Sequence, residues 1–90
     1  MTCEIKTTAR FRKRIAGMEA DALETMSRVQ AGFGQPHHHS GVSIRKLAPG
    51  VFECRTNLKT RLVFIAEKGI LTFDFAGDHG EVQNYLRGKR

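Results

Sequence analysis

The sequence has only two cysteines in 90 residues, no long hydrophobic run, and fewer acidic than basic side chains. Cys3 and Cys54 are too few for a disulfide framework, and they fit a reducing cytoplasm, where cysteine acts as a small apolar residue. No apolar stretch approaches the roughly 18 residues of a membrane-spanning helix, and the first residues lack the apolar block of a secretory signal. We therefore expect neither a membrane protein nor a disulfide-stapled secreted domain.

Positive charge is abundant. The chain carries 15 lysines and arginines against 9 aspartates and glutamates, a formal net charge of +6. Hydrophobic residues make up 40% of the chain, which is far above the range of a disordered protein. The length suits one small domain over residues 1–90. We expect this basic domain to bind acidic partners: nucleic acid, an acidic protein, or both.

The first helical pattern lies near the N-terminus. Phe11, Ile15 and Met18 recur at the spacing of one helical face. Thr8 stands where a helix N-cap is expected. Gly17 is expected to weaken or break this helix.

A second helix is predicted over residues 19–31, because carboxylates occupy its first turn and glycines follow its end. We expect the two helices to form an antiparallel hairpin. The apolar stripe of the second helix is predicted to comprise Leu23, Met26, Val29 or Gln30, and Phe33.

From residue 42 onward the hydrophobic period changes to two, which is typical of β-strands. Turn signals at Pro49-Gly50 and at residues 67–69 separate short runs that suit antiparallel hairpins. The predicted strands cover residues 42–47, 51–56, 61–66 and 70–75, and a short edge strand is expected over residues 3–7.

A short C-terminal helix is predicted after the last strand. Asp78 and Glu81 have the spacing of a capping box, and Val82, Tyr85 and Leu86 give the helix one apolar side. The expected fold class is α+β. It comprises an N-terminal helix pair packed on a four-stranded, largely antiparallel sheet, the short N-terminal edge strand and the C-terminal helix.

Strand alternation assigns the side chains of the sheet to two faces. Charged residues in mid-strand are unusual unless their face is solvated or forms a site. The face expected to cover the helix pair comprises Phe52, Cys54, Leu62, Phe64, Leu71, Phe73 and Phe75. The opposite face combines Glu53, Arg55, Arg61 and Asp74 with Val63 and Ile65.

Arg55 and Arg61 are predicted to share this charged face, which Arg45 joins in one of its two registers. Converging guanidinium groups hold phosphate bidentately and stabilise charge that develops on a reacting phosphate. The alternative is a solvated basic face with cross-strand Glu–Arg pairs. The pattern alone leaves both interpretations open.

His79 follows the last predicted strand. It is a candidate acid or base if the sheet brings it close to the arginine face, and otherwise it is a residue of the helix start. The strand phase predicts that Cys54 is buried, and a buried thiol does not suit a nucleophilic role. Three consecutive histidines, His37, His38 and His39, suit a polar loop better than a metal site, because the side chains of neighbouring residues diverge.

The order of these motifs resembles the RelE/ParE superfamily of bacterial type II toxins. That superfamily has a strand with lysine and leucine, a Glu-x-Arg strand, an arginine–hydrophobic strand and a terminal acidic motif. The matching segments here are Ile44-Arg45-Lys46-Leu47, Val51-Phe52-Glu53-Cys54-Arg55, Arg61-Leu62-Val63-Phe64 and Phe75-Ala76-Gly77-Asp78-His79-Gly80-Glu81-Val82.

The resemblance implies a cytoplasmic toxin that a cognate antitoxin holds in a hetero-oligomer. Its ribonuclease branch cleaves mRNA, often on the ribosome, by attack of a 2′-hydroxyl on the adjacent phosphate, with neither metal nor cofactor. By this resemblance Arg45 and Lys46 would bind substrate, Arg55 and Arg61 would hold and stabilise the phosphate, and His79 would be the general acid or base.

One position departs from the ribonuclease pattern. Where many members carry a tyrosine, this chain has Gln83, and Tyr85 lies two residues further on. Two residues turn a helical side chain through about 200°, so Tyr85 is not expected to replace that tyrosine simply. A toxin that poisons DNA gyrase and a basic nucleic-acid-binding module without activity therefore stay open as alternatives.

Overall fold

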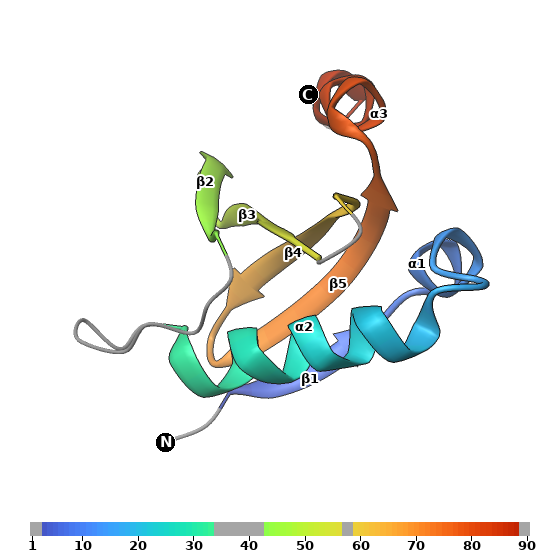
Figure 1. The fold of residues 1–90 in the computed structure, drawn as a ribbon. Helices are drawn as coiled ribbons and strands as arrows, with labels where there is room; N and C mark the ends of the chain where they lie inside the picture. Colours follow the sequence, from blue (N-terminus) through green and yellow to red (C-terminus); the bar gives the residue numbers. More distant parts are fainter. Residues whose placement is uncertain (1–2, 34–42, 57–58, 89–90) are drawn as a thin grey trace.

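The computed structural model describes residues 3–33, 43–56 and 59–88. The three consecutive histidines lie outside these residues. Figure 1 shows the arrangement of the elements, which follow one another as β1 (Glu4–Thr7), α1 (Ala9–Arg14), α2 (Glu19–Gly32), β2 (Arg45–Ala48), β3 (Val51–Arg55), β4 (Arg61–Glu67), β5 (Ile70–Gly77) and α3 (His79–Gly88).

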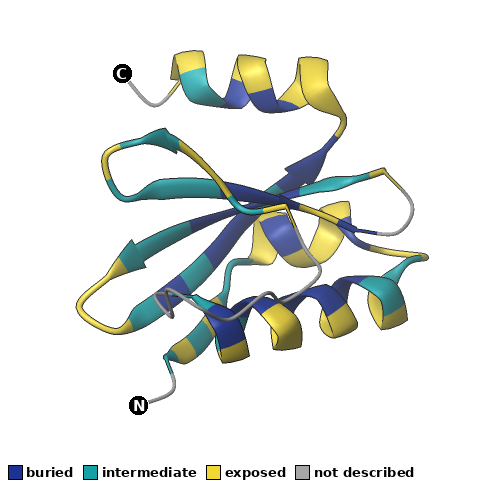
Figure 2. Ribbon diagram, turned by 60° about the vertical axis from the view of Figure 1, so that its left-hand side comes forward, coloured by how far each residue is buried: buried dark blue, intermediate teal, exposed yellow. Residues whose placement is uncertain are grey.

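The strands form one mixed sheet in the order β1-β5-β4-β3-β2. The last four strands form the predicted antiparallel meander. The predicted N-terminal edge strand is confirmed: β1 pairs in parallel with β5, so the described sheet has five strands. Figure 2 shows the sheet lying between α3 on one side and α2 on the other.

The hairpin between β4 and β5 is as tight as its sequence predicts. Lys68 and Gly69 both have positive φ angles, 52° and 80°. Two such residues between paired strands are typical of a hairpin turn whose twist matches that of the strands. The turn at Pro49-Gly50 is also confirmed, and Gly50 has a φ of 75°.

The main core lies between α1, α2 and the sheet. Phe64 is at its centre, because it contacts the rings of Phe33, Phe52 and Phe73 at centroid distances of 5.0 to 5.6 Å. Burial of such side chains is the main favourable contribution to folding. The buried members are Phe11, Ile15, Ala22, Met26, Val29, Cys54, Leu62, Phe64, Leu71, Phe73 and Ala76.

The predicted stripe of α2 is wrong at Leu23. This side chain is 59% exposed and lines an apolar groove with residues of α1. The face that packs on the sheet is shifted by one residue, so that Ala22 and Thr25 are buried together with Met26 and Val29. Ala22 is 0% exposed in the main core, although its side chain is too small to stand out in a hydrophobicity pattern.

The helix pair is also not an antiparallel hairpin. Figure 1 shows α1 close to end-on and α2 along its length. Thr8 caps α1 as predicted, since its Oγ1 accepts a hydrogen bond from Phe11 N at 3.2 Å. The direction of α1 is set by β5, because Thr8 N donates to Phe73 O and Arg14 Nε donates to Ala76 O. The Phe73 carbonyl lies at the end of the pairing between β1 and β5, and the Ala76 carbonyl lies beyond it on the same strand.

A β-bulge in β5 reverses the predicted faces. Val63 faces Phe75 and Phe64 faces Phe73, so Asp74 is an extra residue without a partner on β4. Phe73 therefore points into the main core, whereas Phe75 lies on the opposite face against α3. The prediction that both rings share one face is wrong, because strict alternation does not allow for the extra residue.

The bulge creates a second, smaller core under α3. Val63, Val82 and Tyr85 are buried there, and the ring of Tyr85 stacks on that of Phe75 at 4.8 Å. The face predicted to combine charged residues with Val63 and Ile65 is thus partly covered by a helix. Two of its charged residues, Glu53 and Asp74, are themselves buried.

Asp74 connects three elements at the bulge. Its Oδ2 accepts hydrogen bonds from the Tyr85 hydroxyl of α3 at 2.6 Å and from Arg10 Nη2 of α1 at 2.7 Å. Burial alone would raise the pKa of Asp74, but the bonds from Tyr85 and Arg10 and the charge of Arg10 bring it below its ordinary value. Asp74 therefore stays ionised in the folded protein at neutral pH.

Replacing Asp74 is expected to destabilise the fold. Asp74→Ala should lower the free energy of unfolding at pH 7 by about 1–3 kcal/mol, because the buried Tyr85 hydroxyl loses its acceptor. Chemical denaturation measures this, with the exposed Glu67→Gln as the control. Equal stability of Asp74→Ala and wild type would contradict the role of the bulge.

The same network predicts a pH dependence. Because the pKa of folded Asp74 is lowered, its stabilisation is complete above the pKa of the unfolded residue, about 4, and is lost as the pH falls through the lower folded pKa. The difference in unfolding free energy between wild type and Asp74→Asn should therefore shrink below about pH 4. A difference that grows on acidification would contradict this assignment.

Candidate functional site

Strand register brings the three predicted catalytic residues to one end of the sheet. Arg55 faces Arg61 across β3 and β4, and Arg61 faces Gly77 across β4 and β5. His79 follows Gly77 by two residues and is the first residue of α3. Neighbouring strands lie about 4.8 Å apart, so these backbone positions form a short continuous row.

Arg61 is held in place by a buried carboxylate. Its Nη1 lies 2.7 Å from Glu53 Oε2, and the side chains are 20% and 5% exposed, respectively. The cross-strand Glu–Arg pair that the sequence left open is therefore present. Since a guanidinium has five N–H donors, this bond orients Arg61 and leaves donors for a further anion.

Arg55 and His79 are more accessible. Both are exposed, and among the described residues the structure gives neither side chain a hydrogen bond or an ion pair. Arg55 lies on the same face as Glu53, two residues away along β3. An exposed guanidinium can bind a phosphate, and an exposed imidazole is a group that can exchange a proton with a bound substrate.

The two predicted substrate-binding residues of β2 are separated. Arg45 faces Glu53 and so shares the face of Arg55 and Arg61. Lys46 faces Phe52, whose ring packs in the main core, and therefore lies on the opposite face. The register places only Arg45 with the candidate site.

The start of α3, and with it His79, is fixed by several bonds. Asp78 N donates to Glu81 Oε1 at 2.9 Å and Glu81 N donates to Asp78 Oδ1 at 2.8 Å, which confirms the predicted capping box. Arg14 Nη2 of α1 lies 2.6 Å from Glu81 Oε2. The bond from the Asp78 backbone and the Arg14 guanidinium lower the pKa of Glu81, so this carboxylate stays charged.

Gly77 leaves the room for this ion pair. A Cβ atom at this position would lie 2.8 Å from Glu81 Oε1 and 2.9 Å from Arg14 Nη2. Side chains larger than hydrogen would displace both groups. Gly77 therefore brings the Arg14–Glu81 pair against the end of β5, next to the row that contains Arg61.

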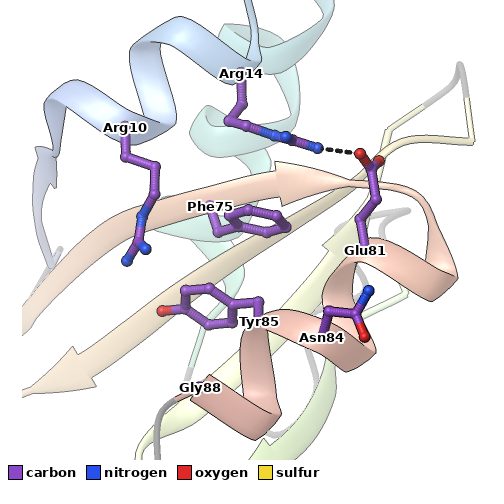
Figure 3. Close-up of a pocket in the computed structure, with 7 residues that line it drawn as sticks. All are labelled: Arg10, Arg14, Phe75, Glu81, Asn84, Tyr85 and Gly88. Atoms are coloured by element: carbon purple, nitrogen blue, oxygen red, sulfur yellow. Dashed lines mark hydrogen bonds and ion pairs between the residues drawn. The ribbon is translucent and has the colours of Figure 1, made fainter.

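Sequence reasoning missed the residues between α1 and α3. A cleft of about 670 Å³ opens there, and Figure 3 shows Arg10 and Arg14 reaching from α1 toward Phe75 and toward the side chains of α3. The spacing of Arg10 and Arg14, four residues apart on one helix, was the available signal. The cleft is lined by Arg10, Arg14, Phe75, Glu81, Asn84, Tyr85 and Gly88.

The side chain of Tyr85 lines this cleft and is held there by a hydrogen bond to Asp74. Its hydroxyl donates to Asp74, and burial together with that bond raises its pKa. The hydroxyl is thereby held beside Arg10 of α1, and that Tyr85 does not simply replace the family tyrosine stays a prediction. Gln83 is exposed on α3.

Cys54 is fully buried, as predicted. Burial and, to a smaller extent, the charge of Glu53 raise the pKa of its thiol to about 12. A thiol with this pKa is a poor nucleophile at neutral pH. In the described part of the chain, no three His, Cys, Asp or Glu side chains are grouped as metal ligands.

The two cysteines should differ in reactivity. Cys3 is partly buried and Cys54 is buried, and both are free thiols. At pH 8 iodoacetamide should modify Cys3 alone in the folded protein, and Cys54 should react only after unfolding in denaturant. Peptide mass spectrometry measures both sites. Rapid modification of Cys54 in the folded protein would show that it is accessible.

Comparison with known proteins gives a likeness in structure. No protein-family model matches the sequence, and no curated protein matches it. The chain is similar to the Escherichia coli toxin of the DinJ–YafQ toxin–antitoxin complex, with a TM-score of 0.69 and 11% identity, covering 91% of this chain and 98% of that chain.

Two further structures are similar. A chain of the RelB–RelE antitoxin–toxin complex from Methanococcus jannaschii gives a TM-score of 0.61 at 9% identity, and the match covers 90% of this chain and 98% of that one. The conserved hypothetical protein HP0892 from Helicobacter pylori gives a TM-score of 0.58 at 20% identity, and the match covers 89% of this chain and 98% of that one. The chain therefore has the fold of the RelE-like toxins. None of its described helices is long and apolar enough to cross a membrane.

Proposed function

We propose that this protein is the toxin of a type II toxin–antitoxin system and cleaves mRNA in the cytoplasm. One observation supports the proposal: Arg55 pairs with Arg61, and Arg61 with Gly77, two residues before His79, in a chain whose fold is that of the RelE-like toxins. The net charge of +6 supports a polyanionic substrate.

In the proposed reaction the 2′-hydroxyl of one nucleotide attacks the adjacent phosphorus. The bond from phosphorus to the 5′-oxygen of the next nucleotide breaks, which leaves a 2′,3′-cyclic phosphate and a 5′-hydroxyl. Arg55 and Arg61 stabilise the charge that develops on the phosphate oxygens. His79 removes the proton of the attacking hydroxyl or supplies one to the leaving oxygen. This chemistry needs neither a metal nor a cofactor.

The remaining assignments concern binding. Arg45 contacts the RNA backbone from the same face as the proposed catalytic arginines, and Lys46 contributes only to the general positive charge. The similar YafQ and RelE chains occur in complexes with DinJ and RelB. We therefore propose a cognate antitoxin as protein partner, in a hetero-oligomer that suppresses the activity.

A second candidate is a toxin that blocks a protein target such as DNA gyrase. Two bonds favour it, because they engage groups that a ribonuclease could use: Glu53 binds Arg61, and the hydroxyl of Tyr85 donates to Asp74. A non-enzymatic toxin would tolerate both features.

Pulse labelling after controlled expression in bacteria separates the two candidates. An early collapse of protein synthesis, absent for Arg55→Ala, supports the ribonuclease. An early collapse of DNA synthesis with intact mRNA would support the gyrase-type toxin instead. Unchanged synthesis of protein, RNA and DNA would reject both.

Substitutions at the proposed site should abolish cleavage without unfolding the protein. We expect Arg55→Ala to lower the rate of RNA cleavage about 10²–10³-fold and His79→Ala about 10²–10⁴-fold. Both residues are exposed, so the melting temperature should stay close to that of wild type. The measurement uses purified protein with labelled RNA in EDTA.

Arg28→Ala is the matched control for lost positive charge. Arg28 lies on α2, where it pairs with Glu24 at 3.0 Å, and α2 lies on the other side of the sheet from α3. Its removal should leave cleavage within about twofold of wild type. If Arg28→Ala and Arg55→Ala lose activity equally, the assignment of Arg55 to the reacting phosphate is wrong.

A further inference from the structure

The cleft between α1 and α3 contains two guanidinium groups with unused donors. Arg10 donates through Nε and Nη2 to Asp74, and Arg14 donates through Nε to Ala76 O and through Nη2 to Glu81. Among the described residues neither Nη1 atom has a partner. The side chains remain 54% and 34% exposed, respectively, so their free N–H groups are accessible from the cleft.

Aromatic rings hold both guanidinium groups in place. Arg10 Cζ lies 5.1 Å from the centre of the Tyr85 ring, and Arg14 Cζ lies 4.6 Å from that of Phe75. Such cation–π contacts orient the planar guanidinium group. The two cations therefore form a preorganised pair, which loses little side-chain entropy when it binds an anion.

The cleft continues from the proposed cleavage site. Glu81 lines it two residues after His79. Arg14 Nη2 lies 2.9 Å from the place of a Cβ atom on Gly77, and Gly77 faces Arg61 across the sheet. A single RNA strand that passes the N-terminal end of α3 thus reaches Arg14 next.

We propose that this cleft binds a nucleotide adjacent to the cleaved position of a single-stranded RNA. The inference rests on the proposed function. The free donors of Arg10 and Arg14 bind the phosphate of that nucleotide. The Asn84 amide lines the same cleft and offers donors to the base. A volume of about 670 Å³ accommodates one nucleotide.

Charge alone does not account for such a site. Asp74 and Glu81 balance the two arginines, so an anion is bound by directed hydrogen bonds. RNA is favoured over an acidic protein segment, because the cleft adjoins the arginine row of the proposed active site.

Gly88 allows a test that leaves both arginines intact. It lines the cleft, and a Cβ atom there would have nothing within 4 Å. Gly88→Glu places a negative charge at the cleft, and Gly88→Gln is its uncharged match. Ser27→Glu on α2, where Ser27 is exposed, controls for the change in net charge.

Binding is measured by fluorescence anisotropy with a fully 2′-O-methylated RNA octamer, which lacks the attacking hydroxyl. We expect Gly88→Glu to weaken binding about tenfold, and Gly88→Gln and Ser27→Glu to stay within about twofold of wild type. Arg10→Gln should also reduce the magnitude of the slope of log association constant against log salt concentration by about 0.7. Equal affinities of Gly88→Glu and Gly88→Gln would overturn the subsite.

Two further outcomes complete the test. An oligoglutamate peptide that displaces the octamer from wild type but not from Gly88→Glu would assign the cleft to an acidic protein segment and overturn the proposal. Cleavage of the unmodified octamer is followed in parallel. If wild type binds RNA through the cleft but does not cut it, the proposed function fails, and with it the place of the cleft beside a cleaved position; only RNA binding by the cleft then stands. If RNA is cut and Gly88→Glu binds normally, only the subsite fails.

Discussion

The β-bulge at Asp74 is the feature on which the rest of this structure depends. If Asp74 continued the regular alternation of β5 instead of bulging, Phe75 would point into the main core with Phe73, and α3 would lack its aromatic partner. With the bulge, Asp74 lies between α1 and α3 and accepts hydrogen bonds from both. The bulge thus positions α3, and α3 begins with His79. Bulges often redirect side chains next to functional sites in this way.

The arginines divide into two groups by what they bind. Arg10 and Arg14 bind carbonyls and carboxylates of the fold, so they join α1 to β5 and to α3. Arg55 has no such contact among the described residues, and Arg61 has only Glu53. N–H donors without structural partners remain available to an anionic substrate. The basic side chains of the chain therefore do not form one uniform surface for binding anions.

Much of the fold could be predicted because it follows from local patterns. The period of two located β3, β4 and β5, and the spacing of Asp78 and Glu81 predicted the capping box that the structure contains. That Arg55 and Arg61 share one face followed from the same alternation, whereas their direct pairing is seen only in the structure. Patterns failed where one residue interrupts a repeat, as at Asp74, or where a small residue is part of the buried face, as at Ala22.

The candidate site was predictable in part for the same reason. Alternation places Arg55 and Arg61 on one face, but contacts between distant segments are not encoded in any local period. The bonds from Arg10 and Arg14 to β5 and α3 join residues more than 60 positions apart. The cleft that they line could therefore be found only in the folded chain.

The central claim is that an arginine row and His79 cleave RNA through its own 2′-hydroxyl. Analysis of the ends of RNA cut by the purified protein tests it most directly. The account predicts 2′,3′-cyclic phosphate and 5′-hydroxyl ends, formed in the presence of EDTA and lost when the scissile nucleotide is 2′-deoxy. Uncut RNA, or cleavage that persists at a 2′-deoxy nucleotide, would contradict it.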